Sequence, residues 1–316
     1  MKPRKKTITR QLLDDARNYF NSKYENDETK RAFVKNYKKF IDYCRSVHDA
    51  KNKDDCKNFI QSYADHLINN SYTASTIHSY LSPVVLYHGM SLNDVKKPKR
   101  TTAHYKRGRS DNGKKQRSDN DINNPKFAKS VTLQRCLGLR RSELMRLRGG
   151  DLRYDESGKP CVYTKGKGGK VQYQRILPMD LELVRSYFEG KATGKLIFAP
   201  DEFKNKIDYH RLRSDQAKRA YNYYLEKCKT GEGREQLEEE VRLRYEKTKI
   251  NSKTGKPMLL KENLTGYYYL RGENKKMAIE NGLPLRYDRL CLMAVSEFHL
   301  AHHRLDVTVE SYLNVK

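Results

Sequence analysis

The sequence contains no tryptophan, no closely spaced cysteine pair and no apolar run long enough to cross a membrane. A membrane-spanning helix needs roughly 20 consecutive apolar residues, so the sequence does not predict a membrane-spanning protein. The basic segment Met1 to Lys6 leads into polar sequence, and it therefore does not predict a signal peptide. We expect a cytoplasmic protein that has no membrane partner.

Cysteines are few and scattered along the chain. A structural zinc site usually takes its ligands from closely spaced cysteine or histidine pairs, and no C-x-x-C pair is present. Most of the cysteines lie in apolar stretches, as small core residues of cytoplasmic proteins do. We therefore expect no bound metal. The cysteines are Cys44, Cys56, Cys136, Cys161, Cys228 and Cys291.

Acidic residues are also few in comparison with basic ones. The chain has 39 Asp and Glu against 65 Lys and Arg, a net charge of +26, and its pI is about 9.7. Such an excess of positive charge binds polyanions, and nucleic acid is the expected partner. A basic protein that binds a membrane surface is the alternative. The length of 316 residues allows two domains with separate cores.

The first part of the chain shows helical periodicity. Residues 1–25 read as a basic N-terminal arm that includes one short helix, and 26–95 as an all-α domain that contacts DNA. A helical bundle with an ordinary charged surface has the same pattern and stays open as an alternative. The expected helices are Leu12 to Tyr24, Lys30 to Val47, Lys53 to Asn69, and a segment that Ser75 caps and Gly89 ends.

Residues 96–120 change in character. The segment is rich in Lys and Arg, is interrupted by Pro98, Gly108 and Gly113, and has almost no large aliphatic residue. A segment that cannot bury a core is a linker, and its charge suits contacts with phosphates. The expected DNA-binding residues are Lys96, Lys97, Lys99, Arg100, Lys106, Arg107 and Arg109.

The remaining part, 121–316, mixes helical and strand patterns. Two helical segments that meet near Arg140, the second reaching about Leu152, precede two short strands joined by a glycine-rich turn. A phosphate-binding loop is the rival interpretation of that turn, but its G-x-x-x-x-G-K-[ST] pattern is not met. The charged segment 229–263 is expected to be a surface insertion. The whole pattern predicts a mostly α fold with a small β-hairpin or sheet, of the α+β class.

Five short motifs follow one another in this part. The first, Gly138-Leu139-Arg140-Arg141-Ser142-Glu143-Leu144, places an arginine in a tight turn between apolar segments, where Glu143 can hold it. The others, in chain order, are Gly166-Lys167-Gly168-Gly169-Lys170, His210-Arg211-Leu212-Arg213, Leu300-Ala301-His302-His303-Arg304 and Tyr312.

In type and order these motifs resemble those of the tyrosine recombinases, the phage-integrase family of DNA breaking and rejoining enzymes, and mobile-element integrases and transposases in particular. The resemblance covers about 125–316 and, more loosely, the helical segment before it, which would be the family's SAM-like core-binding domain. It implies that Arg140 and Arg213 are the catalytic arginines, Lys167 the hairpin lysine, His210 a catalytic histidine and Tyr312 the nucleophile, with Glu143 in support.

Two assignments stay open at this stage. The L-x-H-x-R frame of the fourth motif selects His302, whereas the usual nine-residue gap to the tyrosine selects His303. In addition, Arg271 is an alternate second arginine. Its segment, Tyr268-Tyr269-Leu270-Arg271, lies at distances from the other motifs that are nearer the family's common ones than those of the Arg213 motif. That segment lacks the histidine, and we therefore favour His210 and Arg213.

The resemblance implies a site-specific recombinase that cleaves and rejoins DNA strands through a 3′-phosphotyrosine, and so integrates or excises a mobile element. Two arginines would clamp the phosphate oxygens, His210 would be the base, His302 or His303 the donor to the phosphate, and Lys167 the acid for the leaving 5′-oxygen. No cofactor is implied. A non-catalytic DNA-binding regulator of the same fold and a type IB topoisomerase are the alternatives.

The resemblance also implies partners. One partner is a double-stranded recombination site. The others are further copies of the chain: the protein would be a monomer without DNA and a homotetramer on DNA. Accessory DNA-bending proteins are a further class that the family uses, and the source would be a bacterium, a phage or another mobile element. Subunit contacts are expected from the apolar segment Leu290 to Val295 or from 229–263, because only four residues follow Tyr312.

Overall fold

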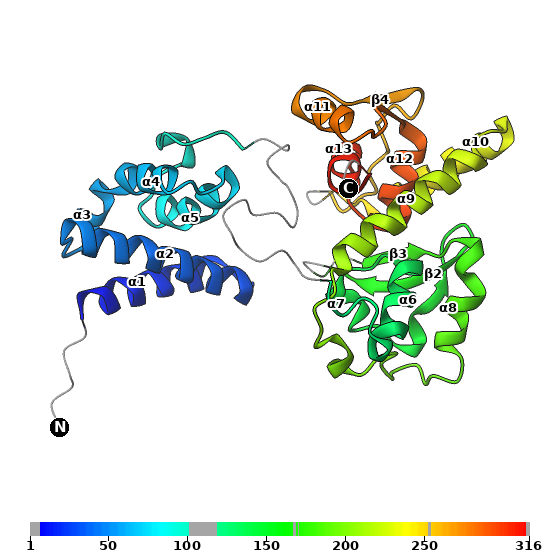
Figure 1. The fold of residues 1–316 in the computed structure, drawn as a ribbon, viewed down its shortest axis with the longest axis horizontal. Helices are drawn as coiled ribbons and strands as arrows, with labels where there is room; N and C mark the ends of the chain where they lie inside the picture. The colour runs from blue at the N-terminus through cyan, green and yellow to red at the C-terminus, as the bar shows by residue number, and fades with distance from the viewer. Residues whose placement is uncertain (1–6, 101–118, 167–168, 170, 252–253, 314–316) are drawn as a thin grey trace. The chain divides into compact units, whose positions relative to one another are not determined.

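The computed structural model describes residues 7–100, 119–166, 169, 171–251 and 254–313. By its internal contacts the chain divides into two compact units, Met1–Lys114 and Lys115–Lys316 (Figure 1).

The regular secondary structure in the described residues of the first unit is all helical. Polar side chains cap most of its α-helices, and the cap of the last α-helix is Thr73, whose side chain accepts from the backbone N–H of Thr76, rather than Ser75. Phe20, Tyr37 and Phe40 are fully buried at its centre. The helices are α1 (Ile8–Lys23), α2 (Asp27–His48), α3 (Lys53–Asn58), α4 (Ile60–Asn69) and α5 (Ala74–Tyr87).

The second unit begins with helices and a small sheet. The sheet is antiparallel in the order β1-β2-β3, and the hairpin of β2 and β3 pairs Cys161 with Arg175 and Lys165 with Val171. The two strands lie on either side of the glycine-rich turn, as the sequence predicts. The elements are α6 (Ala128–Leu137), α7 (Arg141–Leu144), β1 (Leu152–Tyr154), β2 (Pro160–Lys165), β3 (Val171–Arg175) and α8 (Leu181–Phe188).

The helix after Arg140 is much shorter than expected, because α7 ends at Leu144 instead of about Leu152. The backbone N–H groups of Gly149 and Gly150 donate to the carbonyls of Lys195 and Thr193, at 3.0 Å each. A Cβ at Gly149 would lie 2.5 Å from the carbonyl oxygen of Ala192. The two glycines thus allow a close backbone approach that a continued helix would not permit.

The long helix α9 (Tyr209–Lys227) separates the part of the second unit that holds the three-stranded sheet from the C-terminal elements (Figure 1). Its N-cap, Asp208, accepts from the backbone N–H groups of His210 and Arg211. The other elements are α10 (Gly231–Thr248), β4 (Tyr267–Tyr269), α11 (Gly272–Glu280), β5 (Arg286–Asp288), α12 (Arg289–Val295), a π-helical turn Ser296–Leu300, α13 (Leu305–Thr308) and a second π-helical turn Val309–Leu313.

The structure qualifies one expectation for this half and corrects another. Within segment 229–263 most of the described residues of 249–263 are at least partly exposed, whereas α10 buries Leu237 and Val241 completely in the core of the second unit. The apolar segment Leu290 to Val295 cannot supply a subunit contact, because all of its residues are at most 2% exposed in the same core. The sequence displays the apolar character of a helix but not which neighbour covers it.

The fold class is confirmed: the structure is mostly α-helical, with a three-stranded and a two-stranded antiparallel sheet in its described parts. No helix among the described residues is both long and apolar enough to cross a membrane.

Candidate active site

The turn before α7 holds Arg140 through Glu143. Gly138 ends α6 with a φ of +62°, and the chain then turns so that the backbone N–H of Arg140 donates to Glu143 Oε2 at 2.8 Å. The Arg140 guanidinium donates to Glu143 Oε1 at 2.5 Å. Glu143 is buried while Arg140 is 32% exposed, so the carboxylate fixes one side of a guanidinium whose other side stays accessible.

Arg213, near the start of α9, is completely buried. Its Nη1 donates to the carbonyl of Gly138 at 2.5 Å, and its Nη2 donates to the carbonyl of Leu300 at 3.0 Å. Burial lowers the pKa of its guanidinium, while Tyr312 and Glu143 act in the opposite direction. Arg213 therefore joins the turn of Arg140 to the π-helical turn before His302.

Tyr312 lies close to the side chains of His302, His210 and Arg213. Its hydroxyl is 2.9 Å from His302 Nε2, and its ring lies edge to face with the His210 ring, at a centroid distance of 5.2 Å. The guanidinium carbon of Arg213 is 5.7 Å from the same ring. Tyr312 is 3% exposed. Residues from α9 and from both sides of α13 thus meet at one phenol.

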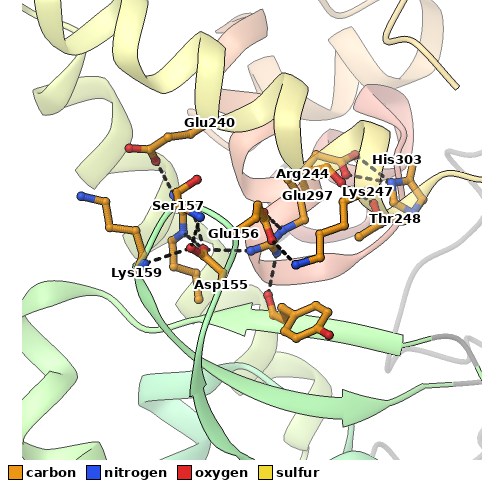
Figure 2. A network of polar contacts seen from close by, with 12 residues as sticks. Asp155, Glu156, Ser157, Lys159, Glu240, Arg244, Lys247, Thr248, Glu297 and His303 are labelled. Atoms are coloured by element: carbon orange, nitrogen blue, oxygen red, sulfur yellow. Dashed lines mark hydrogen bonds and ion pairs between the residues drawn. The ribbon is translucent and has the colours of Figure 1, made fainter. Parts of the chain in front are cut away.

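The two adjacent histidines have different surroundings. His302 faces Tyr312, whereas His303 Nδ1 is 2.9 Å from both carboxylate oxygens of the buried Glu297 (Figure 2). A π-helical turn accommodates one residue more than an α-helix does over the same length. Tyr312 lies in such a turn, which explains how it reaches His302 although the nine-residue gap selects His303.

The remaining sequence-predicted residues lie elsewhere. Arg271 is exposed just before α11. Lys167 lies outside the described residues. Of the expected DNA-binding residues, Lys96, Lys99 and Arg100 are exposed and Lys97 is half-buried, with its Nζ donating to the carbonyls of Leu92 and Val95. Lys106, Arg107 and Arg109 lie outside the described residues.

Sequence reasoning missed a buried ionic network between α10 and the sheet. Arg244 of α10 donates from Nη2 to Asp155 at 2.9 Å and from Nη1 to the carbonyl of Tyr173 at 2.7 Å. Asp155 also accepts from Arg175, 2.7 Å away, and Arg175 in turn pairs with Glu240 at 2.5 Å. Figure 2 shows Asp155 and Arg244 facing each other between the hairpin and α10.

This network also reaches the π-helical turn before His302. The guanidinium carbons of Arg175 and Arg244 lie 3.6 and 5.1 Å from the centroid of the Phe298 ring. The neighbouring His299 is completely buried and lies within hydrogen-bonding distance of Gln216 and of the Tyr224 hydroxyl. Burial and the nearby arginines hold the pKa of His299 well below its ordinary value. His299 is therefore a buried core histidine, held between Gln216 and Tyr224.

The backbone on both sides of His302 is left-handed: φ is +51° at Ala301 and +57° at His303. Alanine in this region is strained by about 1 kcal/mol or more, whereas glycine is not. We expect Ala301→Gly to raise the free energy of unfolding by about 0.5 kcal/mol, since the greater freedom of glycine in the unfolded chain offsets part of the gain. Ala278→Gly, the same change within α11, should lower it by about 1 kcal/mol. Urea unfolding of both variants measures the two shifts, and a destabilised Ala301→Gly would contradict the strain.

Three solved structures align with much of the chain. A XerA recombinase is 12% identical, with 96% of this chain and 93% of that chain covered and a TM-score of 0.26. The XerH site-specific recombinase bound to a palindromic difH substrate, a post-cleavage complex, is 12% identical over 96% and 80%, with a TM-score of 0.37. The integrase from mycobacterium phage Brujita is 14% identical over 68% and 79%, with a TM-score of 0.25.

These recombinases and this integrase are proteins to which the chain is similar. No family model and no curated protein sequence matches the chain.

Proposed function

We propose that the chain is a tyrosine-type site-specific DNA recombinase, which cleaves and rejoins DNA through a 3′-phosphotyrosine and integrates or excises a mobile element. The observation that carries this proposal is the Tyr312 hydroxyl at 2.9 Å from His302 Nε2. The same ring packs against His210 and Arg213. Residues about 100 positions apart in sequence thus converge on one phenol.

A phenol has an ordinary pKa near 10 and is a weak nucleophile until a base accepts its proton. The contact with Tyr312 favours His302, rather than His210, as this base. In the proposed step the phenol oxygen attacks the phosphorus, the phosphorus–oxygen bond to the 5′-oxygen breaks, and the leaving 5′-oxygen accepts a proton. Bond energy is kept in the phosphotyrosine, so rejoining needs no other energy source.

The two arginines would stabilise the negative charge that attack places on the nonbridging oxygens. Arg140 is held by a buried carboxylate and is still 32% exposed, so its free N–H groups can reach a phosphate. Arg213 is buried and fixed by two carbonyls in the absence of DNA, so we propose that it also positions the segment that carries His302.

In this proposal 26–95 is the core-binding domain, 96–120 the basic linker and 121–316 the catalytic domain, and the net charge of +26 supports binding to duplex DNA. We propose a monomer that forms a tetramer on paired sites in the cytoplasm.

A regulator that only binds DNA does not require a phenol beside a histidine and a buried arginine. A type IB topoisomerase would form the same adduct but would relax supercoiled DNA as a monomer.

A suicide oligonucleotide with a nick next to the cleavage position tests the chemistry. We expect the wild type to form a covalent protein–DNA adduct, Tyr312→Phe to form none, and Tyr269→Phe, which alters an exposed tyrosine, to form as much as the wild type. Denaturing electrophoresis and peptide mass spectrometry would locate the adduct. Absence of any adduct with a set of candidate sites, or an adduct on another residue, would contradict the proposal.

The role of Lys167 as the acid has its own test. Lys167→Ala should slow cleavage of an ordinary phosphodiester but not of a substrate with sulfur as the 5′-bridging atom, because a thiolate leaves without a proton. Lys165→Ala, a change at an exposed lysine of the same hairpin, should leave both rates unchanged. Single-turnover cleavage rates measure the difference. If sulfur restores nothing to Lys167→Ala, then Lys167 is not the acid.

A further inference from the structure

Two cysteines that the proposed chemistry does not use lie in contact in the second unit. The Sγ atoms of Cys228 and Cys291 are 3.8 Å apart, and they are 63 residues apart in the sequence. Cys228 caps the C-terminal end of α9 and is half-buried, whereas Cys291 lies in α12 and is fully buried. Neither forms a disulfide in this structure.

The two sulfurs are not equivalent. The Cys291 thiol donates to the Cys228 sulfur, and this hydrogen bond, together with Arg234 and Lys227 nearby, lowers the pKa of the Cys228 thiol. The same hydrogen bond and burial raise the pKa of Cys291. A thiolate, rather than a thiol, reacts with peroxides, and a partly exposed thiolate beside positive charge is the reactive kind. Cys228 has these properties. Cys291 lies close enough to act as the resolving thiol, which is the thiol that attacks the oxidised cysteine to form a disulfide.

We propose that Cys228 and Cys291 form a reversible redox pair that a peroxide oxidises to a disulfide. The Cys228 thiolate attacks one peroxide oxygen, the O–O bond breaks, and the cysteine becomes a sulfenic acid while hydroxide leaves and is protonated. The Cys291 sulfur then attacks the Cys228 sulfur, its proton and the departing hydroxide leave as water, and the S–S bond forms. In total two thiols and one hydrogen peroxide give one disulfide and two waters.

The consequence is a covalent link between two elements that carry site residues. The opposite end of α9 bears His210 and Arg213, and α12 continues into the π-helical turn whose Leu300 carbonyl accepts from Arg213. To form the bond, the two sulfurs must approach from 3.8 Å to about 2.05 Å. The proposal does not depend on the recombinase assignment, because its test is chemical.

The full chain, reduced and freed of reductant, would be treated with hydrogen peroxide, denatured, and alkylated with N-ethylmaleimide. We expect four of the six cysteines to remain alkylatable, a Cys228–Cys291 cross-linked peptide by mass spectrometry, and full recovery of both thiols with dithiothreitol. The oxidised form should melt about 5 °C or more above the reduced form, because the link closes a long loop. Cys44 and Cys56, which are both fully buried in the first unit, serve as an internal control and should stay reduced.

Two variants separate the roles of the pair. Cys291→Ser should leave a sulfenic acid on Cys228 that dimedone labels, whereas Cys228→Ser should leave Cys291 unlabelled. If circular dichroism shows that a serine variant is unfolded, the corresponding alanine variant is used instead. The peroxide experiment on the wild type tests the disulfide without any variant. Six alkylatable cysteines after peroxide, a link between other cysteines, or dimedone labelling of Cys291 in Cys228→Ser would each overturn the proposal.

Discussion

Replacing Arg213 by alanine is expected to abolish adduct formation and to lower the free energy of unfolding by about 3–5 kcal/mol. The loss of stability follows from its contacts: the carbonyls of Gly138 and Leu300 each lose their donor. In addition, the buried Glu143 loses one of its two guanidinium neighbours. The effect on cleavage follows because the π-helical turn that precedes His302 loses its attachment to α9.

Arg213→Lys and Arg271→Ala are the matched variants. Lysine keeps the charge but cannot bridge two carbonyls with one planar group, so stability should recover in part while cleavage stays absent. Arg271 is exposed, and Arg271→Ala should change neither property. Urea unfolding gives the stability, and the nicked oligonucleotide gives the cleavage at a temperature where each variant is folded. If Arg271→Ala abolishes cleavage and Arg213→Ala does not, the second catalytic arginine has been assigned incorrectly.

Replacing Arg244 by methionine should lower the free energy of unfolding by a similar amount, about 3–5 kcal/mol, because it leaves buried carboxylates with too few partners. Burial alone would raise the pKa of Asp155, and Arg175 and Arg244 hold it below its ordinary value instead. Methionine fills much of the volume of the arginine stem, so the loss reports on charge rather than on a cavity.

Lys247→Ala is the control for Arg244→Met. Glu156 pairs with Arg244 as well as with Lys247. Lys247 lies on the same helix as Arg244 and is 3.5 Å from Glu156, but its side chain is 46% exposed. An exposed ion pair is worth at most about 1 kcal/mol, so this variant should unfold almost as the wild type does. Thermal and urea unfolding measure both. Equal effects of the two variants would show that the burial of the Arg244 network contributes nothing.

The motif residues were visible in the sequence because each lies in a short, ordered pattern with its own chemistry. Glu143 follows Arg140 by three residues, so local helix geometry alone brings them together. The choice between His302 and His303 could not be made in this way. It depends on two left-handed residues and a π-helical turn, and nothing in the local sequence indicates these features.

The network of Arg244 was hidden for a different reason. Asp155 and Arg244 are 89 residues apart, and α10 has so many charged residues that its sequence resembles that of a solvated surface helix. Leu237, Val241 and Tyr245 recur every four residues, but Leu243 of the same helix is exposed, and so short an apolar stripe does not distinguish a buried helix from an ordinary surface helix. The burial of this helix could be recognised only when its partners on the sheet were known.

The two carbonyl acceptors of Arg213 have a consequence for how such a protein can change over generations. Tyr312 could become phenylalanine with little cost to folding, because its ring would still fill the same space. Arg140 is partly exposed and could also be lost. Arg213 could not be lost so easily, because it connects segments 75 and 87 residues away from it. If a descendant of this protein no longer cleaved DNA, Tyr312 and Arg140 would therefore be replaced earlier than Arg213. Arg213 would remain because the fold requires it.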